Sequence, residues 1–169
     1  MSLEHRTRPA QRVSSNLLLG GAIGTTGLLA GLYYGYAVSV MPGLHRAGDQ
    51  TMVEAMQQID RAIQNPVFFI SFLGAPALSL WALIRARRGQ SNEALKWIMA
   101  GFALNALGLL ITAGLNIPLN NQLDKAKNVA AARHDFENPW IAWNIVRTLV
   151  TTAAFACLAR VPFLRSRTS

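Results

Sequence analysis

Arg147 is the residue whose type and position most suggest chemistry, because it lies inside the last long hydrophobic segment of the sequence. A guanidinium keeps its positive charge, so a buried arginine needs a partner, a water molecule or a ligand. Ionisable side chains within membrane-spanning segments are costly and usually mark a working interior. Arg147 shares one helical face with polar and aromatic side chains, namely Trp140, Trp143, Asn144, Thr148 and Thr151. We therefore expect this face to point into the protein.

Two interpretations of Arg147 remain open at this point. In the first, it pairs with an acid of a neighbouring loop, such as Asp60, Glu54 or Glu137, and ties that loop to the bundle. In the second, it binds an anion or an oxygen that gains negative charge during a reaction. Candidate side chains to orient the guanidinium are Asn116, Asn120 and Asn144. A helix cap or a hydrogen bond between helices is the ordinary role of each asparagine.

Metal chemistry has little support in the sequence. His45 follows the first hydrophobic segment and is the histidine best placed to reach a site near Arg147, although a solvated histidine is its ordinary interpretation. There is no HExxH motif and no close histidine pair, and the single cysteine, Cys157, excludes an internal disulfide. We therefore predict no metal site.

The elements that must position these residues are long apolar segments. Hydrophobic residues make up 51% of the 169 residues and charged residues only 14%, against about 25% in soluble proteins. The apolar residues form blocks at 17–41, 66–84, 97–117 and 140–159, each close to the ~20 residues of a membrane-spanning helix. We predict an all-α fold, a four-helix transmembrane bundle over residues 17–160, with basic tails at 1–16 and 161–169.

The distribution of charge predicts the orientation of this bundle. The net charge of +8 does not form one basic face with interleaved aromatics, so we predict no nucleic-acid partner. Basic residues dominate both tails and the connection between the second and third spans, whereas the two other loops also carry acids. The predicted location is therefore an integral, multi-pass membrane protein with both termini cytoplasmic, in the plasma membrane or the inner membrane of a bacterium.

The two outer loops and their borders carry local structural signals. Residues 49–64 place apolar side chains at helical spacing, which predicts a short amphipathic helix in the first outer loop. The second outer loop, residues 119–138, has weaker helical character. Pro66 and Pro139 are expected to start the second and fourth spans, and Ser91 or Asn92 is a candidate cap for the third.

Small residues predict where the helices approach one another closely. Gly20, Gly24, Gly27, Gly31 and Gly35 follow one face of the first span. Gly101, Asn105, Gly108 and Thr112 follow one face of the third. Both stripes are interpreted as packing seams, with Asn105 hydrogen-bonding across a helix interface.

Three segments together resemble the anthrone oxygenase family of small integral membrane proteins, which is also catalogued as a domain of unknown function. They are Tyr36-Ala37-Val38-Ser39-Val40-Met41-Pro42-Gly43-Leu44, Asn116-Ile117-Pro118-Leu119-Asn120 and Trp143-Asn144-Ile145-Val146-Arg147-Thr148. The resemblance implies four membrane helices. It also implies a monooxygenase that converts anthrones to anthraquinones with dioxygen and needs no metal or organic cofactor, although many bacterial members have no known activity.

The resemblance suggests roles for the residues above. Arg147 would stabilise the enolate oxygen of an apolar aromatic substrate, and His45 is the base by residue type. Asn144 belongs to the same predicted catalytic set, as a side chain that could orient the guanidinium. Substrate contacts would come from Trp143, Trp140, Asn116, Asn120 and Tyr36. The expected partners are membrane lipids, an anthrone- or hydroquinone-like molecule and dioxygen. The competing function is non-catalytic binding of a lipid, quinone or aromatic ligand, and a small transporter subunit is less favoured because the spans show no inverted repeat.

Overall fold

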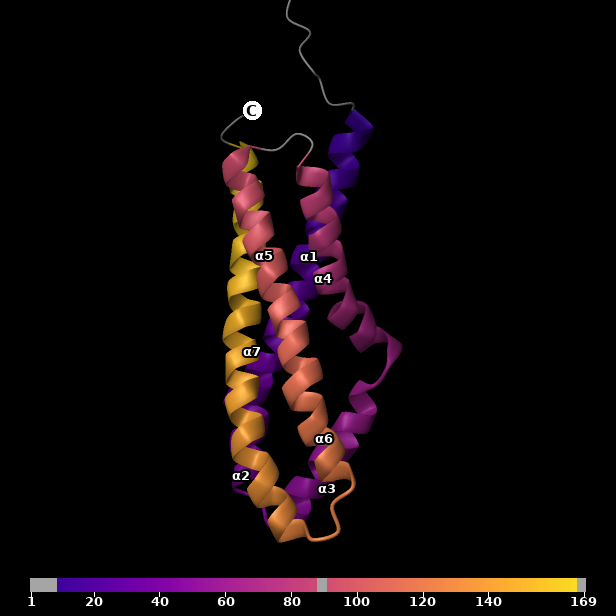
Figure 1. Cartoon of the computed structure of the whole chain (residues 1–169), viewed down its shortest axis with the longest axis vertical. Coiled ribbons are helices and arrows are strands. Elements are labelled where there is room, and N and C mark those ends of the chain that lie inside the picture. The colour runs from indigo at the N-terminus through magenta and orange to yellow at the C-terminus, as the bar shows by residue number, and fades with distance from the viewer. Residues whose placement is uncertain (1–8, 88–90, 167–169) are drawn as a thin grey trace, which may run out of the picture.

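The computed structural model describes residues 9–87 and 91–166, with side chains from 15–87 and 91–164. Its long helices are α1 (Pro9–Gly35), α4 (Pro66–Ala86), α5 (Asn92–Ile111) and α7 (Val129–Ser166). They run side by side in one elongated bundle (Figure 1). Residues 1–8 of the first predicted tail, residues 167–169 of the second, and residues 88–90 between α4 and α5 lie outside the described residues.

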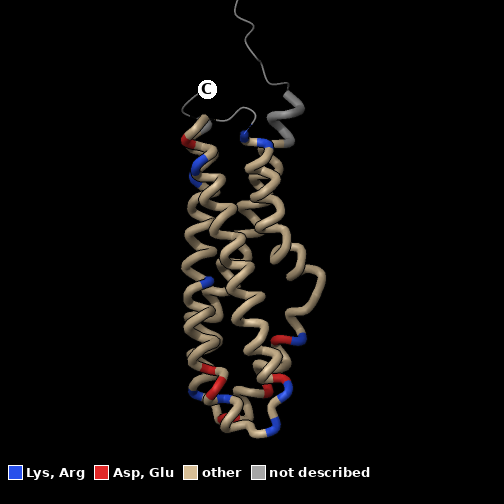
Figure 2. The backbone as a smooth tube through the Cα atoms, in the orientation of Figure 1, with Lys and Arg blue, Asp and Glu red and all other residues tan. Residues whose placement is uncertain are grey.

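Among the described residues, four helical stretches are long and apolar enough to cross a membrane. They are Ser15–His45, Pro66–Ala86, Asn92–Asp124 and Val129–Leu164. The predicted all-α transmembrane bundle is thus confirmed, and the chain is a multi-pass integral membrane protein. Charged residues gather towards the two ends of the bundle, and its middle is almost free of them (Figure 2).

Shorter helices build the end of the bundle opposite the start of α1 and the end of α7. The π-helical turn η1 (Tyr36–Val40) and α2 (Met41–His45) continue α1, and η2 (Thr112–Asn116) and α6 (Ile117–Asp124) continue α5. Helix α3 (Asp49–Ile63) lies across this end, together with α2 and α6 (Figure 1). The end of the bundle that α3 crosses is called the cavity end below. The opposite end, where α1 begins and α7 finishes, is called the terminal end.

Helix α3 is the amphipathic helix that the sequence predicts. Met52, Val53 and Met56 of its apolar face are buried in a hydrophobic cluster with residues of α6 and α7. The other members of that cluster are Tyr36, Met41, Leu123, Phe136 and Trp140. The buried face fixes α3 as a cover over the cavity end.

The caps of α4 and α5 follow the sequence signals, but the start of α7 does not. Pro66 occupies the first turn of α4, and Ser91 accepts a hydrogen bond from the backbone N–H of Ala94. Pro139, expected to start the fourth span, lies ten residues inside α7, because that helix already begins at Val129. Burial of Phe136 against α3 stabilises the turns of α7 that precede Pro139. It offsets the loss of the backbone hydrogen bond that proline cannot donate.

The two predicted packing seams have different outcomes. On α5 the prediction holds: a Cβ added at Gly101 would lie 2.6 Å from Cγ of Leu158, and Asn105 donates to Thr26 Oγ1 at 3.0 Å. On α1 it is wrong for Gly20, Gly24 and Gly31, since these positions are exposed and an added Cβ would meet nothing within 4 Å. The buried face of α1 carries instead Leu19, Ala22, Thr26, Leu29, Ala30 and Tyr33. Gly20, Gly24 and Gly31 therefore lie on the outer surface of the bundle. Gly27 of the same stripe does pack, since a Cβ added there would lie 3.1 Å from the ring of Phe155.

Candidate active site

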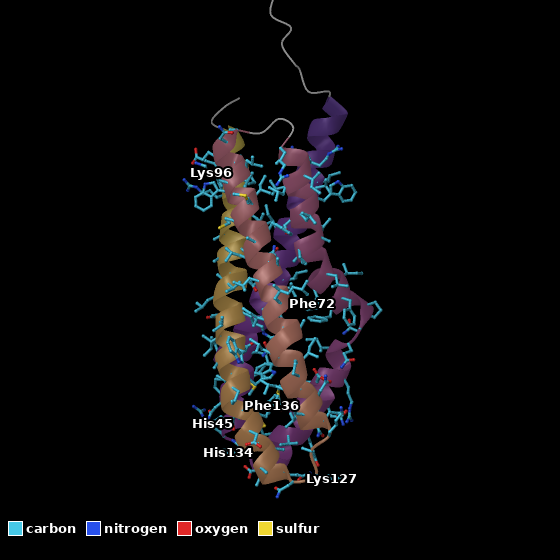
Figure 3. The ribbon with its side chains drawn as sticks, in the orientation of Figure 1. His45, Phe72, Lys96, Lys127, His134 and Phe136 are labelled. Carbon is cyan, nitrogen blue, oxygen red and sulfur yellow. The ribbon has the colours of Figure 1, made fainter. Side chains whose placement is uncertain are left out.

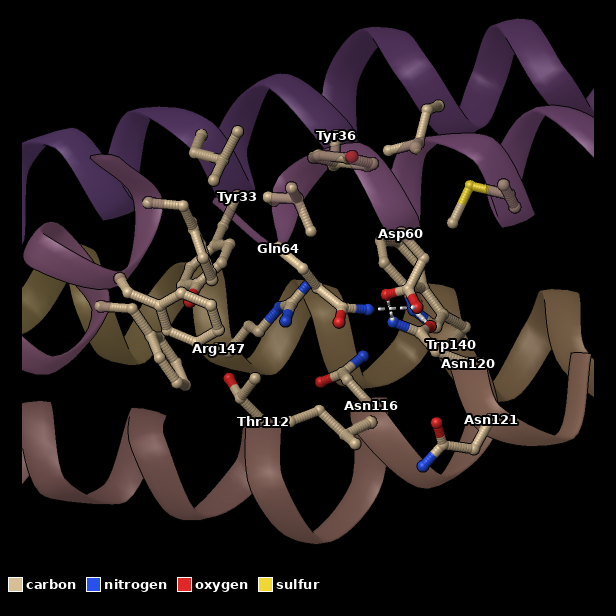
Figure 4. Close-up of a pocket in the computed structure, with 18 residues that line it drawn as sticks. Tyr33, Tyr36, Asp60, Gln64, Thr112, Asn116, Asn120, Asn121, Trp140 and Arg147 are labelled. Carbon is tan, nitrogen blue, oxygen red and sulfur yellow. Dashed lines mark hydrogen bonds between the residues drawn. The ribbon is translucent and has the colours of Figure 1, made fainter. Parts of the chain in front are cut away.

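A cavity of about 240 Å³ lies at the cavity end, enclosed by α1 and η1, α3, the first turns of α4, η2 with α6, and α7 (Figure 4). Its polar and aromatic-polar lining consists of Tyr33, Tyr36, Asp60, Gln64, Thr112, Asn116, Asn120, Asn121, Trp140 and Arg147. Its apolar lining consists of Leu32, Met56, Ile59, Ile63, Phe68, Phe69, Phe72 and Ile117. The volume is slightly below the ~300–1,000 Å³ of drug-sized ligand pockets, so the cavity suits one small molecule.

Two π-helical turns present side chains to this cavity. In η1 the N–H of Met41 bonds to the carbonyl of Tyr36, and in η2 the N–H of Ile117 bonds to the carbonyl of Thr112. A proline is the second residue after each turn, Pro42 after η1 and Pro118 after η2. Because proline has no N–H to donate, the α-helical hydrogen-bond pattern is interrupted at both places. Such π-turns are frequent at functional sites. Here they bring Tyr36, Thr112 and Asn116 into the lining.

Arg147 is buried, with 6% of its surface exposed, and lies in the cavity lining. Its Nε and Nη2 donate to Oδ1 of Asn144 at 3.1 and 3.0 Å, and its Cζ lies 4.2 Å from the Tyr33 ring centroid and 5.2 Å from that of Trp140. Asn144 in turn donates to the backbone carbonyl of Tyr33 at 3.2 Å. An asparagine oxygen and two aromatic faces thus hold the cation in place.

No carboxylate among the described residues lies within ion-pair distance of Arg147. Glu137 pairs instead with Arg133 at 2.7 Å and with His45. Glu54 accepts a hydrogen bond from Gln50, and Asp60 accepts one from Asn120. The guanidinium charge is therefore left available to a molecule in the cavity.

Asn116 is the second unusual group of the lining. Only 1% of its surface is exposed, and neither its Nδ2 nor its Oδ1 has a hydrogen-bond partner among the described residues. An unpaired buried amide costs about 1–3 kcal/mol, so native structures rarely keep one without a reason. A ligand that occupied the cavity could satisfy both atoms.

Asp60 is the carboxylate of the described lining. Its Oδ1 accepts a hydrogen bond from Nδ2 of Asn120, whose Oδ1 accepts one from Nε1 of Trp140 at 2.8 Å. Figure 4 shows Asp60, Asn120 and Trp140 together on one side of the cavity. Desolvation raises the pKa of Asp60 above its ordinary value, and the hydrogen bonds from Asn120 and Gln64 oppose this rise.

The cavity reaches the apolar surface of the bundle at one side. Phe69 of α4 and Ile117 of α6 belong to its lining, yet 43% and 42% of their surfaces are exposed. Behind Phe69, the rings of Phe68 and Phe72 stack with centroids 5.2 Å apart. This side of the cavity is therefore apolar, and it is formed by two of the four helical stretches long enough to span a membrane.

The structure brings together most, but not all, of the residues that the sequence singled out. Arg147, Trp140, Asn116, Asn120 and Tyr36 line the cavity, and Asn144 lies directly behind Arg147.

Two predicted site residues lie elsewhere. Trp143 is on the outer surface with 36% exposed and is absent from the described lining. His45 is also outside this lining; its side chain is 70% exposed and bonds through Nδ1 to Glu137. Figure 3 places His45 near the tip of the cavity end, well away from Phe72. Among the described residues, no group of three or more His, Cys, Asp or Glu side chains could hold a metal ion.

Sequence reasoning missed Asp60 as a lining residue, together with Tyr33, Gln64 and Thr112. A signal for Asp60 exists: it continues the helical face of Val53 and Met56, so it is an acid on the apolar side of an amphipathic helix. Gln64 follows one turn later and lies beside it in Figure 4.

Comparison with known families agrees with this architecture. The family model described as anthrone oxygenase matches residues 62–157, which include Asn116, Asn120, Trp140 and Arg147 of the cavity. No curated protein and no solved structure matches the chain. Because the match spans more than half of its residues, the chain belongs to the anthrone oxygenase family.

Proposed function

We propose that this membrane protein is an oxygenase that acts, without a cofactor, on an apolar aromatic substrate of the anthrone or hydroquinone type. The observation that carries the proposal is a buried guanidinium that faces a cavity and has no carboxylate partner among the described residues. Keeping a cation desolvated and unpaired is costly, and sites that stabilise negative charge are where proteins accept this cost.

The walls of the cavity suit a planar apolar molecule. Tyr33, Tyr36, Trp140 and Phe72 supply ring surfaces, and the exposed Phe69 and Ile117 connect the lining to the lipid-facing surface. Aromatic rings pack on one another with a gain beyond simple burial. A poorly soluble substrate and dioxygen both partition into a bilayer, so entry from the membrane fits this wall.

The chemistry needs charge stabilisation more than a redox partner. Loss of a proton from the CH₂ group of an anthrone gives an enolate, whose negative charge rests largely on the carbonyl oxygen. Arg147 would stabilise this oxygen, with Asn116 as a second hydrogen-bond donor beside it. The enolate reduces dioxygen directly, the CH₂ becomes C=O and one water leaves. The net reaction of substrate and O₂ to quinone and water balances without an external reductant.

The orientation in the membrane is part of the proposal. The basic residues Arg85, Arg87, Lys96 and Arg160 belong to the terminal end, whereas acids cluster with basic residues at the cavity end. By the positive-inside rule, both termini are cytoplasmic and the cavity lies towards the outer face.

Oxygen uptake by the purified protein with an anthrone tests the proposal. Arg147→Gln should lower the rate by about 10²–10³-fold, the loss seen when one oxyanion-stabilising group is removed. Arg147→Lys should recover part of it, because the charge remains but the planar fork is lost. Arg46→Gln is the matched control, since Arg46 lies at the same end, is exposed and is outside the described lining. Undiminished uptake by folded Arg147→Gln protein would refute the role of Arg147.

The alternative is a non-catalytic protein that binds a lipid, quinone or aromatic ligand in the same cavity. The position of His45 outside the described lining favours it, because the histidine expected to act as base does not reach the cavity. An anthraquinone or quinone that raises the melting temperature, with no oxygen consumption on any anthrone or hydroquinone, would support binding alone.

A further inference from the structure

We infer that Asp60 is the catalytic base, the group that takes the proton from the substrate carbon and later returns it to the peroxide. The inference rests on the proposed function and names a residue for its first chemical step. It follows from where Asp60 lies, how it is held and which charges surround it.

Asp60 projects from α3 into the same cavity as Arg147 and is the carboxylate of the described lining, in which no histidine, lysine or cysteine occurs. The side chains in Figure 4 place Asp60 at the Trp140 side and Arg147 towards Tyr33, with Asn116 and Gln64 in view between them. One molecule can therefore face a base at one edge and a cation at the other.

The hydrogen bonds of Asp60 leave it able to accept a proton. Trp140 Nε1 is only a donor, so its bond to Oδ1 of Asn120 fixes the amide with its NH₂ group towards Asp60. Asn120 therefore orients Oδ1 of the carboxylate. Among the described residues, Oδ2 accepts one long hydrogen bond, from Gln64 Nε2 at 3.4 Å. Its remaining lone pairs are free for a substrate C–H.

The described charged side chains around Asp60 do not form an ion pair with its carboxylate. Its neighbour Arg61 pairs with Asp124 at 2.6 Å, and both of these side chains are about half exposed. Tyr36 faces Asp60 from η1, and Arg147 lies across the cavity without forming an ion pair with it. Partial burial without a bound cation makes a carboxylate more basic, which is the direction of its pKa change.

A connected set of contacts holds the Asp60 carboxylate and the Arg147 guanidinium apart. From Asp60 it runs through Asn120 to Trp140, whose ring lies 5.2 Å from Cζ of Arg147. Asn144 completes it behind the guanidinium. These contacts keep the Asp60 carboxylate and the Arg147 guanidinium from forming a salt bridge, so both remain available to a substrate.

The proton balance closes on Asp60. The C–H bond of the CH₂ group breaks, its proton goes to the carboxylate, and its electron pair moves towards the carbonyl oxygen beside Arg147. After the enolate carbon bonds to dioxygen, Asp60 returns the proton to the terminal peroxide oxygen. Asp60 then takes the second proton from the same carbon as the O–O bond breaks, and the departing hydroxide receives it to leave as water. The carboxylate ends as it began.

The test separates deprotonation from oxygen chemistry. Purified protein is incubated without oxygen in D₂O with anthrone, and deuterium uptake at the CH₂ carbon is followed by mass spectrometry above the buffer rate. Asp60→Asn should slow the exchange by about 10²–10⁴-fold, the usual contribution of a positioned base. Glu54→Gln is the matched control, because it removes an exposed carboxylate from the same helix. Anthraquinone binding checks that the cavity of each variant is intact.

The pH profile provides a second readout. Wild-type exchange should rise with pH as Asp60 loses its proton, at a pH above the ordinary range of a carboxyl because its pKa is raised. Asp60→Asn should remove this rise, which loss of a purely structural side chain would not do.

The outcomes distinguish the base from the overall function. Unchanged exchange in Asp60→Asn protein that still binds anthraquinone overturns the role of Asp60 while leaving an oxygenase intact. Wild-type exchange that depends on Asp60, without oxygen uptake, supports the base and refutes the oxygenase. Wild-type protein that neither exchanges deuterium nor consumes oxygen overturns both.

Discussion

The two ends of the bundle differ in how closely their side chains pack and in how their polar groups are paired. At the terminal end, the core is apolar and closely packed, and it consists of Leu19, Ala22, Ala82, Leu83, Ala86, Ala94, Ile98, Leu158 and Val161. At the cavity end, the helices leave about 240 Å³ unfilled. One half of the molecule is therefore closely packed, whereas the other half contains a cavity.

Hydrogen bonding separates the two regions as clearly as packing does. In the closed part of the bundle, Ser79 donates to the carbonyl of Ala75, and Asn105 donates to Thr26. Around the cavity, Asn116 is unpaired and Arg147 has no carboxylate partner among the described residues. Polar groups that serve the fold are satisfied by the fold, whereas those left over are candidates for ligand contact.

The largest expected difference in stability is between two variants that each add one methyl group, one at the closely packed α5–α7 interface and one on the outer surface. Gly101→Ala would place a Cβ 2.6 Å from Cγ of Leu158, and such overpacking costs about 1–3 kcal/mol. Gly31→Ala is the matched control, because an added Cβ at that exposed helical position meets nothing within 4 Å. Both changes gain the same ~0.5–1 kcal/mol of helix propensity, so their difference reports packing alone.

Thermal unfolding in detergent measures this difference. Gly101→Ala should melt below wild type, and Gly31→Ala at or slightly above it. Equal melting temperatures would mean that α5 and α7 can move apart at little cost in free energy, and that the terminal end is not closely packed.

A smaller effect should distinguish two buried asparagines on the same continuous helix. Asn105→Leu removes the bond to Thr26 and should cost about 1 kcal/mol, the usual value for a hydrogen bond between membrane helices. Asn116→Leu removes an amide that has no described partner, so it should be neutral or stabilising. Anthraquinone binding should show the reverse order, with Asn116→Leu weakened and Asn105→Leu close to wild type. The distinction between fold and site fails if Asn116→Leu destabilises the protein more than Asn105→Leu.

The sequence predicts the architecture of this protein much better than its site. Long apolar blocks, the spacing of Met52, Val53 and Met56, and Ser91 before a helix depend on local rules, and the structure follows them. Arg147 could be recognised as a candidate site residue because a charged side chain within a hydrophobic segment is unusual whatever surrounds it. The stripe of Gly20, Gly24 and Gly31 misled because spacing shows that residues share a face, but not which neighbour that face meets.

The choice between Asp60 and His45 shows why the site itself was harder to predict. Histidine is the ordinary base near neutral pH, so residue type alone favoured His45. Burial reverses this preference, because a carboxylate withdrawn from water becomes more basic. Helical spacing places Asp60 on the apolar face of α3, but the cavity that this face meets depends on how α3 packs against α6 and α7, which no local pattern in the sequence encodes.

The smallest effect is expected from His45→Gln. The imidazole is 70% exposed and bonds to Glu137, which Arg133 also holds at 2.7 Å, so its loss leaves that carboxylate paired. A pair this exposed contributes about 0.5 kcal/mol or less. Because the ring is outside the described lining, His45→Gln protein should catalyse deuterium exchange of anthrone at the wild-type rate. Its exchange rate should also rise with pH as that of the wild type does. A large loss of exchange with unchanged melting temperature would mean that α2 moves towards the cavity during turnover. The base would then have to be assigned to His45 rather than to Asp60.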